Sequence, residues 1–355
     1  MQEKERIKSI IEPLIEWYQN NKKVLPWREG KSPYRVWISE IMLQQTRTSA
    51  VIAYFLRFIE KYPTLAALAA AEEDELMKLW EGLGYYSRAR NLKRCAEMIM
   101  RDFDGEFPKD LKILMSLPGI GPYTAGAISS IAFGEPTPAV DGNVLRVLMR
   151  VLASDRDIAQ ESTKRAVTEL LSSVYPQGDL AAAFTESLME LGENICIPNG
   201  EPRCENCPIC KQCFAYEGKI QTLFPIKSPK KPRKVERRTI LVICEDDSVL
   251  IRKRPPKGLL ASLYEFINLE GVCSRDEVEQ LLFECGHYDF EMEKLPEATH
   301  IFTHIEWQMT GYKILLQAPP SDTLIRRYDL IRVSREEIER HYSIPTAYKS
   351  FLKAL

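Results

Sequence analysis

The segment "LPGIGPYTAGAI" (residues 117–128) joins two helical patterns through a short turn that contains two glycines. Gly119 and Gly121 permit positive φ angles and a close approach to the backbone. Pro122 suits the first position of the second helix, whose first amides have no acceptor within the helix. Free amides at a helix N-terminus can bind an anion, and on a helix–hairpin–helix that anion is typically a DNA phosphate. A glycine-rich turn alone mostly just joins helices, but the longer pattern predicts a helix–hairpin–helix over residues 112–133.

Helical patterns also dominate the sequence around this hairpin. "SPYRVWISEIMLQQ" opens with Ser32 as a candidate N-cap and Pro33 at the first helical position. "EEDELMKLW" begins with the acidic residues that helix N-termini favour. Because no alternating apolar pattern precedes residue 220, the sequence predicts an all-α domain over residues 1–222.

The pattern changes after this domain. "KSPKKPRKVERR" (227–238) holds seven Lys or Arg residues and one Glu. We interpret residues 223–236 as a basic, solvated linker, which is also compatible with binding phosphates. Beyond it, "RTILVICEDDSVLIRKR" is typical of a β-hairpin, "LYEFINL" and "TGYKILLQA" of strands, and "RDEVEQLLFEC" and "SREEIERH" of helices. The sequence therefore predicts a small α+β domain over residues 237–355.

Composition and charge narrow the class of protein. The 355 residues carry a formal net charge of −2, so any polyanion must bind to a local positive surface. The charged beginning "MQEKERIKSI" argues against a secretory signal, and the uncharged stretches are too broken for a transmembrane span. We expect no membrane association and a cytoplasmic location, in a bacterial cell and near the nucleoid.

Five of the nine cysteines fall within residues 196–213. In a cytoplasmic protein such a cluster usually binds a metal rather than forming disulfides. Four thiolates at Cys196-x7-Cys204-x2-Cys207-x5-Cys213 suit zinc or a 4Fe–4S cluster, although a zinc ribbon more often has two separated CxxC pairs. We interpret Cys210 as a non-ligand, but the spacing also allows it to replace one of the four.

Two carboxylates stand out. In "SEIMLQQTR" (39–47), Glu40 lies among apolar residues. A solvated helix face is the common explanation for a helical Glu, and a buried functional acid is the alternative. In "PAVDGNV" (138–144), Asp141 suits an N-cap, or a carboxylate held at a helix mouth beside the hairpin.

Together, the hairpin, "VDGNV", the cysteine cluster and "SEIMLQQTR" resemble the helix–hairpin–helix DNA glycosylases, and more narrowly the adenine DNA glycosylases of the MutY family. The resemblance extends through "LPWR" (25–28) and "WEGLGYYSRARNL" (80–92) over nearly the whole chain. It implies an all-α glycosylase domain with a 4Fe–4S loop at 196–213 and an α+β Nudix-like C-terminal domain. The family usually has x6 between the first two cluster cysteines, so this loop is one residue longer.

The resemblance also implies catalytic roles. Glu40 would protonate adenine at N7 and then handle the water, and its apolar neighbours would raise its pKa as such an acid requires. Asp141 would stabilise, or transiently bond, the sugar carbon, while Asn143 orients Glu40 and the water. In relatives that also cut the strand, a lysine of the hairpin's second helix forms a Schiff base. Tyr123 occupies that position, which predicts a monofunctional glycosylase.

Further residues are carried over as base contacts. Gln45, Thr46, Leu83 and Tyr85 would form the wedge and the contacts to the opposite base, with core or turn packing as the alternative, most evenly balanced for Leu83. Trp27, Arg28 and Glu186 would line the adenine pocket. Alternatively, each of them makes ordinary packing contacts or belongs to a structural ion pair. The C-terminal domain would sense 8-oxoguanine through Phe302, Thr303 and His304, where the family more often has Ser in the middle position. "CSRDEVEQLLFECG" lacks the acidic pairs that hold Mg²⁺ in Nudix hydrolases.

We therefore expect a monomeric enzyme that excises adenine opposite 8-oxoguanine, or opposite guanine, in double-stranded DNA. Three alternatives remain. A bifunctional pyrimidine-lesion glycosylase/lyase is disfavoured by Tyr123. A mismatch thymine/uracil glycosylase can also carry Tyr there but would lack the C-terminal domain. A catalytically inactive binder of damaged DNA is disfavoured by the complete set of catalytic residues.

Overall fold

The computed structural model describes residues 2–229 and 232–355, so Lys230 and Lys231 of the basic segment lie outside the described residues. Contacts group the chain into two compact units, one of residues 1–70 with 91–229 and one of residues 71–90 with 230–355. Each unit has its own core. Within the described residues, no helix is long and apolar enough to cross a membrane.

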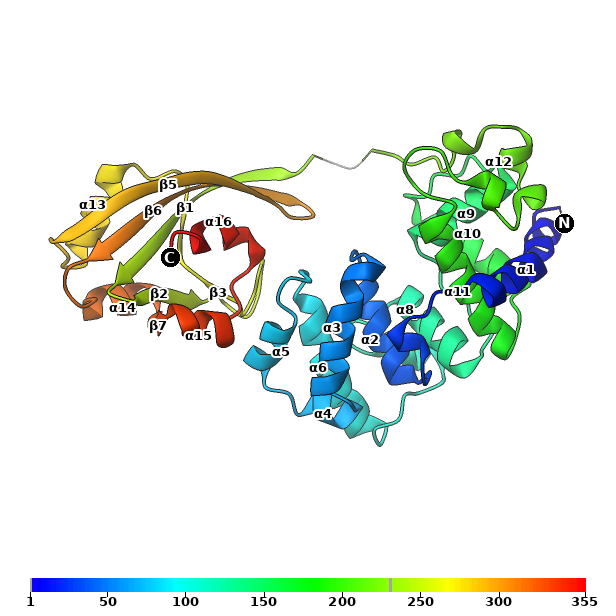
Figure 1. Cartoon of the computed structure of the whole chain (residues 1–355), viewed down its shortest axis with the longest axis horizontal. Coiled ribbons are helices and arrows are strands. Elements are labelled where there is room, and N and C mark those ends of the chain that lie inside the picture. Colours follow the sequence, from blue (N-terminus) through cyan, green and yellow to red (C-terminus); the bar gives the residue numbers. More distant parts are fainter. Residues whose placement is uncertain (1, 230–231) are drawn as a thin grey trace. The chain divides into compact units, whose positions relative to one another are not determined.

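The described part of the first unit consists of helices and loops (Figure 1). Its helices are α1 (Gln2–Asn21), η1 (Pro26–Arg28), α2 (Pro33–Leu43), α3 (Thr48–Lys61), α4 (Leu65–Ala69), most of α6 (Ser87–Asp102), α7 (Leu111–Ser116), α8 (Pro122–Ala127), η2 (Ile128–Ala132), α9 (Gly142–Leu152), α10 (Glu161–Ser172), α11 (Asp179–Asn194), η3 (Cys204–Asn206), η4 (Cys210–Gln212), α12 (Phe214–Glu217) and η5 (Gln221–Leu223). The predicted all-α class of this part is confirmed.

Helix α2 shows how the sequence builds this unit. The Ser32 hydroxyl accepts a hydrogen bond from the Arg35 amide (3.3 Å), and Pro33 occupies the first position, as predicted. Every residue from Val36 to Met42 is buried, so the helix has no solvated face along that stretch. Glu40 is consequently buried with its apolar neighbours, which excludes the solvated-face interpretation.

The predicted hairpin joins α7 to α8, which continues as one π-helical turn, η2. Gly119 has φ +76°, and a Cβ there would lie 2.7 Å from the Cβ of Asn91, so glycine is required at this turn. Gly121 differs from the prediction. Its φ of −91° is open to any residue, and an added Cβ would meet only open space. A small residue there leaves the amides of α8 accessible instead.

In the described part of the second unit, seven strands form one mixed sheet in the order β3-β2-β1-β6-β5, with β4 on β1 and β7 on β2. The strands are β1 (Lys234–Glu245), β2 (Ser248–Lys253), β3 (Tyr264–Glu265), β4 (Ile267–Glu270), β5 (Phe290–Ile301), β6 (Ile305–Leu316) and β7 (Leu330–Ser334), and the helices are α5 (Glu73–Leu79), α13 (Arg275–Glu284), α14 (Asp322–Tyr328), α15 (Arg335–Arg340), η6 (Thr346–Tyr348) and α16 (Lys349–Leu352). The β1–β2 hairpin is antiparallel, as predicted, whereas β1 and β6 pair in parallel.

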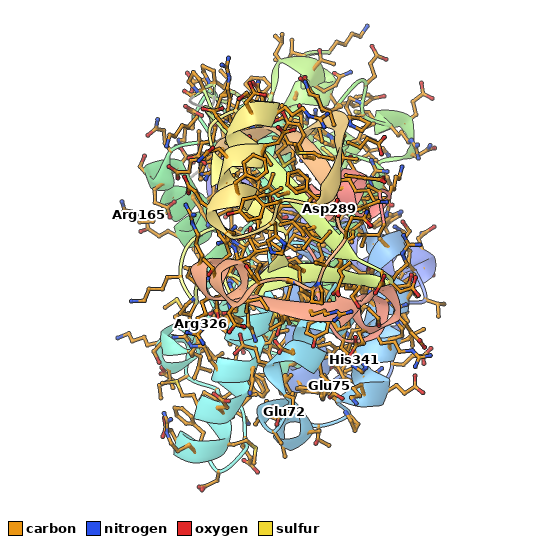
Figure 2. All side chains as sticks on the ribbon, turned by 90° about the vertical axis from the view of Figure 1, so that its left-hand side faces the viewer. Glu72, Glu75, Arg165, Asp289, Arg326 and His341 are labelled. Carbon is orange, nitrogen blue, oxygen red and sulfur yellow. The ribbon has the colours of Figure 1, made fainter. Side chains whose placement is uncertain are left out.

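Alternation along β1 places apolar side chains on both faces of the sheet. Ile240 and Val242 pack into a core that includes residues of α15 and α16, whereas Leu241 and Ile243 pack into one that includes residues of α13 and α14. The residues labelled in Figure 2 are exposed polar and charged ones: Glu72, Glu75, Arg165, Asp289, Arg326 and His341. The sheet begins at Lys234, inside the segment interpreted as a linker. Residues 302–304 form the turn between β5 and β6.

Candidate active site

A cavity of about 1290 Å³ in the first unit collects side chains from distant parts of the sequence. They come from η1, α2, α8, the N-terminus of α9, and α11. The predicted site residues that line it are Trp27, Arg28, Glu40, Gln45, Thr46, Tyr123, Asp141, Asn143 and Glu186. The fold thus brings together both predicted catalytic carboxylates and the predicted base-pocket residues.

Glu40 is 5% exposed, and burial raises the pKa of its carboxyl group to about 7. The hydroxyl of Tyr123 donates a hydrogen bond to Glu40 Oε2 (2.8 Å), which acts in the opposite direction on the pKa. The carboxylate of Asp141 adds a smaller upward effect. Glu40 is therefore an acid that changes protonation state near neutral pH, inside a cavity that can admit a ligand.

Asp141 is the N-cap of α9, as the sequence allowed, and it is partly buried. Its Oδ1 accepts hydrogen bonds from the amides of Asn143 (2.9 Å) and Val144 (2.8 Å), and its Oδ2 accepts one from Asn143 Nδ2 (2.8 Å). Burial raises the pKa of Asp141, and these three donors counteract that effect because they favour the charged form. The geometry fixes both carboxylate oxygens at the mouth of the helix.

Asn143 contacts a different carboxylate from the one predicted. In the described part of the chain it has no hydrogen bond to Glu40; its amide instead donates to Asp141. Its Oδ1 accepts from Arg146 Nη2 (2.9 Å), and Arg146 also donates to the carbonyls of Gly192 (2.8 Å) and Cys196 (2.7 Å). Sequence reasoning missed Arg146, because only the fold shows that it links this pair to the first cysteine of the loop.

Arg28 lies within a second group of charged side chains. Its Nε donates to Glu186 (3.0 Å), and its Nη1 donates to Glu190. Lys31 Nζ donates to the other oxygen of Glu186 (2.7 Å). The side chains of Glu186 and Glu190 are both buried. The predicted pocket residues Arg28 and Glu186 form an ion pair there. Sequence reasoning missed Glu190 and Lys31, although the four-residue spacing of the two acids on α11 was a usable signal.

The remaining predicted contacts are distributed over both units. Trp27 packs edge-on against Phe55 with ring centroids 5.4 Å apart. Gln45 is exposed and adopts φ +59°, an uncommon conformation for a residue other than glycine. Thr46 is partly buried beside it.

In the second unit, Leu83 is buried, whereas Tyr85 is 46% exposed with φ +48°. The hydroxyls of Tyr85 and Thr303 lie 3.3 Å apart, so two predicted opposite-base contacts meet within this unit. Phe302 is partly buried against Trp307 (5.0 Å between centroids), and His304 is exposed at the same turn. Leu83 is thus the only one of these that the structure describes as packed in the core.

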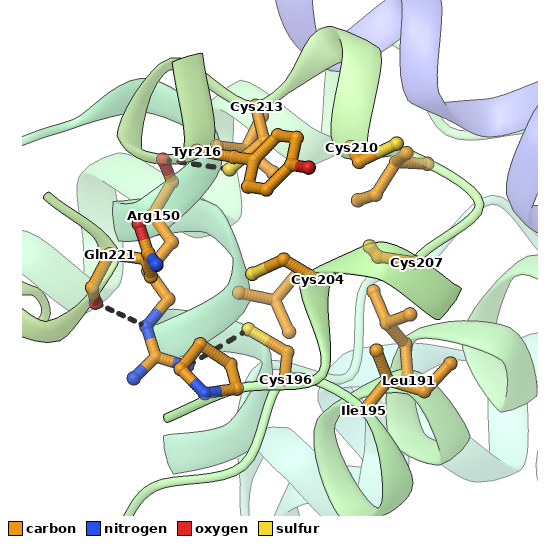
Figure 3. Close-up of a pocket in the computed structure, with 14 residues that line it drawn as sticks. Arg150, Leu191, Ile195, Cys196, Cys204, Cys207, Cys210, Cys213, Tyr216 and Gln221 are labelled. Carbon is orange, nitrogen blue, oxygen red and sulfur yellow. Dashed lines mark hydrogen bonds between the residues drawn. The ribbon is translucent and has the colours of Figure 1, made fainter. Parts of the chain in front are cut away.

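The five cysteines of residues 196–213 line one pocket at the end of α9 and α11 (Figure 3). Arg150 Nη1 donates to the sulfur of Cys196 (3.2 Å), and the Cys213 thiol donates to the Arg150 carbonyl (3.3 Å). The four predicted ligands Cys196, Cys204, Cys207 and Cys213 all interact electrostatically with one another. Cys210 lines the same pocket and interacts electrostatically with Cys204, so its role as a non-ligand stays a prediction.

The donor set of this pocket bears on the kind of group that it could hold. Among the described residues, no three Cys, His, Asp or Glu side chains converge on a point where one metal ion could bind. A single zinc ion needs sulfurs about 2.3 Å from one centre. In an iron–sulfur cluster each cysteine binds a separate iron, so the sulfurs stand farther apart. Four thiolates are the donor set that both zinc and a 4Fe–4S cluster take, so the residues of the pocket fit either group.

Comparison with known proteins assigns the family. Residues 38–173 match the model of the HhH-GPD superfamily of base excision DNA repair proteins, and residues 238–354 match the NUDIX domain. Adenine DNA glycosylase of Mus musculus is 34% identical over 375 residues, which cover 87% of this chain and 71% of the relative. The chain belongs to the adenine DNA glycosylase family. It is a DNA N-glycosylase, and hence a hydrolase.

Two more members of the adenine DNA glycosylase family show the same extent of similarity. The Homo sapiens enzyme is 33% identical, and the match covers 88% of this chain and 68% of that enzyme. The enzyme of Buchnera aphidicola subsp. Schizaphis graminum (strain Sg) is also 33% identical, and the match covers 82% of this chain and 83% of that enzyme. The predicted family and the Nudix class of the C-terminal domain are confirmed.

Solved structures confirm the helical fold of the glycosylase part. A thermostable thymine-DNA glycosylase superposes with a TM-score of 0.54 at 28% identity, covering 60% of this chain and 98% of that one. A trapped endonuclease III–DNA covalent intermediate superposes with a TM-score of 0.52 at 26% identity, and the match covers 61% of this chain and 98% of that one. Neither structure covers the whole of this chain.

Proposed function

We propose that this chain hydrolyses the N-glycosidic bond of adenine paired with 8-oxoguanine, or with guanine, in double-stranded DNA. One observation carries the proposal: Glu40, a buried acid whose pKa burial raises to about 7, shares a cavity with the hydrogen-bonded carboxylate of Asp141. An oxocarbenium-like transition state needs a proton donor for the leaving base and an anion near the sugar. The relatives named adenine DNA glycosylases support adenine as the base.

In this mechanism Glu40 acts first as an acid. The bond between the sugar C1′ and adenine N9 breaks, and its electron pair leaves with the base. The proton of Glu40 passes to N7, so that the base departs uncharged. Glu40, now a carboxylate, removes a proton from the water that adds to C1′, which restores the acid. A pKa near the working pH serves both steps.

Asp141 supplies the negative charge near the sugar. The two backbone amides and the Asn143 side chain hold its carboxylate in place. It stabilises the positive sugar carbon, or bonds to it transiently, until water adds. Preorganised charge of this kind is worth more inside a cavity than in water.

The same cavity supports a monofunctional reaction. The described residues between Lys112 and Lys164 include no lysine, and the Tyr123 hydroxyl donates a hydrogen bond to Glu40. A phenol cannot form a Schiff base with the sugar. Excision therefore leaves an abasic site, and the strand breaks only after alkali.

Further contacts with DNA are part of the proposal. The hairpin at Gly119 and Gly121 would bind a phosphate through the first amides of α8. Gln45 and Thr46 in the first unit, and separately Tyr85 in the second, would contribute to the wedge and to the contacts with the opposite base, and the burial of Leu83 favours packing for that residue. Phe302, Thr303 and His304, beside Tyr85, would contact the 8-oxoguanine. We propose that the protein acts as a monomer.

We propose a 4Fe–4S cluster in the cysteine pocket, held by Cys196, Cys204, Cys207 and Cys213. The four thiols line one pocket and interact electrostatically with one another, and the likeness of the helical part to endonuclease III supports the proposal. When bound, the cluster supplies a rigid cross-link for the loop that follows α11. Iron and sulfide content with visible absorbance would support this assignment, and one equivalent of zinc in the protein as isolated would contradict it.

The experiment for the activity compares four duplexes under single-turnover conditions: adenine opposite 8-oxoguanine, adenine opposite guanine, thymine opposite guanine, and a thymine glycol substrate, each with and without alkali. We expect alkali-dependent cleavage of both adenine substrates, faster opposite 8-oxoguanine. Excision of thymine but not adenine would overturn the proposal in favour of a mismatch thymine glycosylase. A strong borohydride-trapped covalent product would overturn the monofunctional mechanism.

A further inference from the structure

Two of the three nitrogens of the Arg28 guanidinium are held by hydrogen bonds. Its Nε donates to Glu186 Oε1 (3.0 Å), and its Nη1 donates both to Glu190 and to the carbonyl of Lys23 (2.9 Å). The ring of Tyr18 covers one face, with the guanidinium carbon 5.3 Å from the ring centroid. In the described part of the chain Nη2 has no hydrogen-bond partner. Because Arg28 lines the cavity, that edge is left for a ligand.

Glu186 and Glu190 contribute differently to this arrangement. Glu186 also binds Lys31, so it is shared between two cations. The Oε1 of Glu190 accepts from Arg28 and from the backbone amide of Lys23 (3.2 Å). Glu190 is 4% exposed, and it therefore joins the segment before η1, the guanidinium and α11 at one buried point.

We propose that Glu190 is a positioning residue that fixes the free edge of Arg28 against the extruded base. The inference rests on the proposed function. A neutral purine offers ring nitrogens as hydrogen-bond acceptors, and Nη2 of Arg28 is a donor of fixed direction for one of them. The guanidinium is a rigid plane, so a rotation about the Cδ–Nε bond moves Nη1 and Nη2 together. A hydrogen bond that holds Nη1 at Glu190 therefore also sets the direction of Nη2.

A positioning role of Glu190 differs in its consequences from a contribution to folding stability alone. Glu190 touches neither the carboxylate of Glu40 nor that of Asp141 through a hydrogen bond among the described residues. Its loss should leave the acid and the anion in place and should leave the DNA phosphate contacts unchanged. The base would then enter the cavity with the wrong orientation, which lowers the rate of excision rather than the affinity for DNA.

The test is a double-mutant cycle of Glu190→Gln and Arg28→Gln in the full chain, on adenine opposite 8-oxoguanine. We expect Glu190→Gln to lower the single-turnover rate about 10- to 100-fold, the range for misplaced reacting groups. Affinity for a duplex whose target adenosine carries a rate-slowing 2′-fluorine should stay within about twofold. In the Arg28→Gln background, the second substitution should lower the rate by less than about twofold, because coupled residues are not additive.

Two further variants complete the design. Asp179→Asn, on the same helix, removes an exposed carboxylate that is not among the residues lining the cavity, and it should leave the rate within about twofold of the unmodified chain. Glu190→Asp keeps the negative charge and should recover part of the rate lost in Glu190→Gln. If Glu190→Gln folds poorly, Glu190→Asp takes its place in the comparison. Equal activity of Glu190→Gln, or independent multiplication of the two effects, would overturn the proposal. An unmodified chain with no activity on adenine would refute the proposed function instead.

Discussion

Glu40 and Asp141 line the same cavity, but the chain treats the two carboxylates differently. Glu40 lies inside a helix buried along its length and accepts its described hydrogen bond from one phenol, Tyr123. Asp141 lies at the mouth of a helix and accepts three hydrogen bonds from amides. Burial raises the pKa of both, but only Asp141 has several donors that favour its charged form. Surroundings, rather than residue type, separate the acid from the anion.

The largest expected effect comes from Glu40→Gln, which removes the proton donor while keeping the shape. Excision of adenine opposite 8-oxoguanine should fall about 10²- to 10⁴-fold, the range for general acid catalysis. DNA binding should persist, because Glu40 is not among the residues proposed to contact phosphates. Single-turnover rates and affinities for the same duplex measure both quantities.

Thermal unfolding provides the control for this variant. The folded-state pKa of Glu40 is raised from 4.5 to about 7. Folding is therefore favoured by the protonated form, and that contribution is lost as the pH rises through about 7. Because that contribution is lost between the unfolded-state pKa of 4.5 and about 7, Glu40→Gln should unfold at a higher temperature than the unmodified chain at pH 8, and the difference should narrow as the pH falls toward 4.5. A lower melting temperature at pH 8 would show that the carboxylate is structurally required.

Asp141→Asn should have a somewhat smaller effect on the rate, about 10²- to 10³-fold, because it removes a preorganised charge but no proton donor. Asn is also a good N-cap, so α9 should remain stable to within about 1 kcal/mol. Full activity of Asp141→Asn at unchanged stability would refute the contrast between the two acids.

Tyr123→Phe should have the smallest effect on the maximal rate and the most specific effect on its pH dependence. The phenol favours the charged form of Glu40, so its removal should raise the pKa of Glu40 further. The fall in rate on the alkaline side should then move to higher pH. An unchanged pH profile would separate Tyr123 from the function of Glu40.

Much of this site could be predicted from the sequence because local rules determined it. The Ser32-Pro33 helix start, the N-cap at Asp141 and the turn at Gly119 each depend on a few adjacent residues. The burial of Glu40 could be suspected from its apolar neighbours, since a helix without a polar face must lie in a core. Strand β5 was missed because most of its residues are exposed and carry no alternating pattern.

Other features arise only when distant elements meet. The link from Arg146 to the Cys196 carbonyl depends on how α9 packs against α11. Gly192 makes this packing possible, because a Cβ there would lie 2.8 Å from the Cβ of Asn143. The role of Glu190 likewise requires η1 and α11 to be adjacent. No spacing within one segment encodes such contacts.

The pH dependence of the single-turnover rate, measured between pH 5 and 9 on adenine opposite 8-oxoguanine, tests the central claim most directly. If Glu40 donates its proton with a pKa of about 7, the rate should be highest on the acid side and fall as the pH rises through that value. The fall should be absent from the residual activity of Glu40→Gln. A rate that stays constant from pH 6 to 9, or that falls identically in Glu40→Gln, would contradict the assignment of Glu40 as the acid.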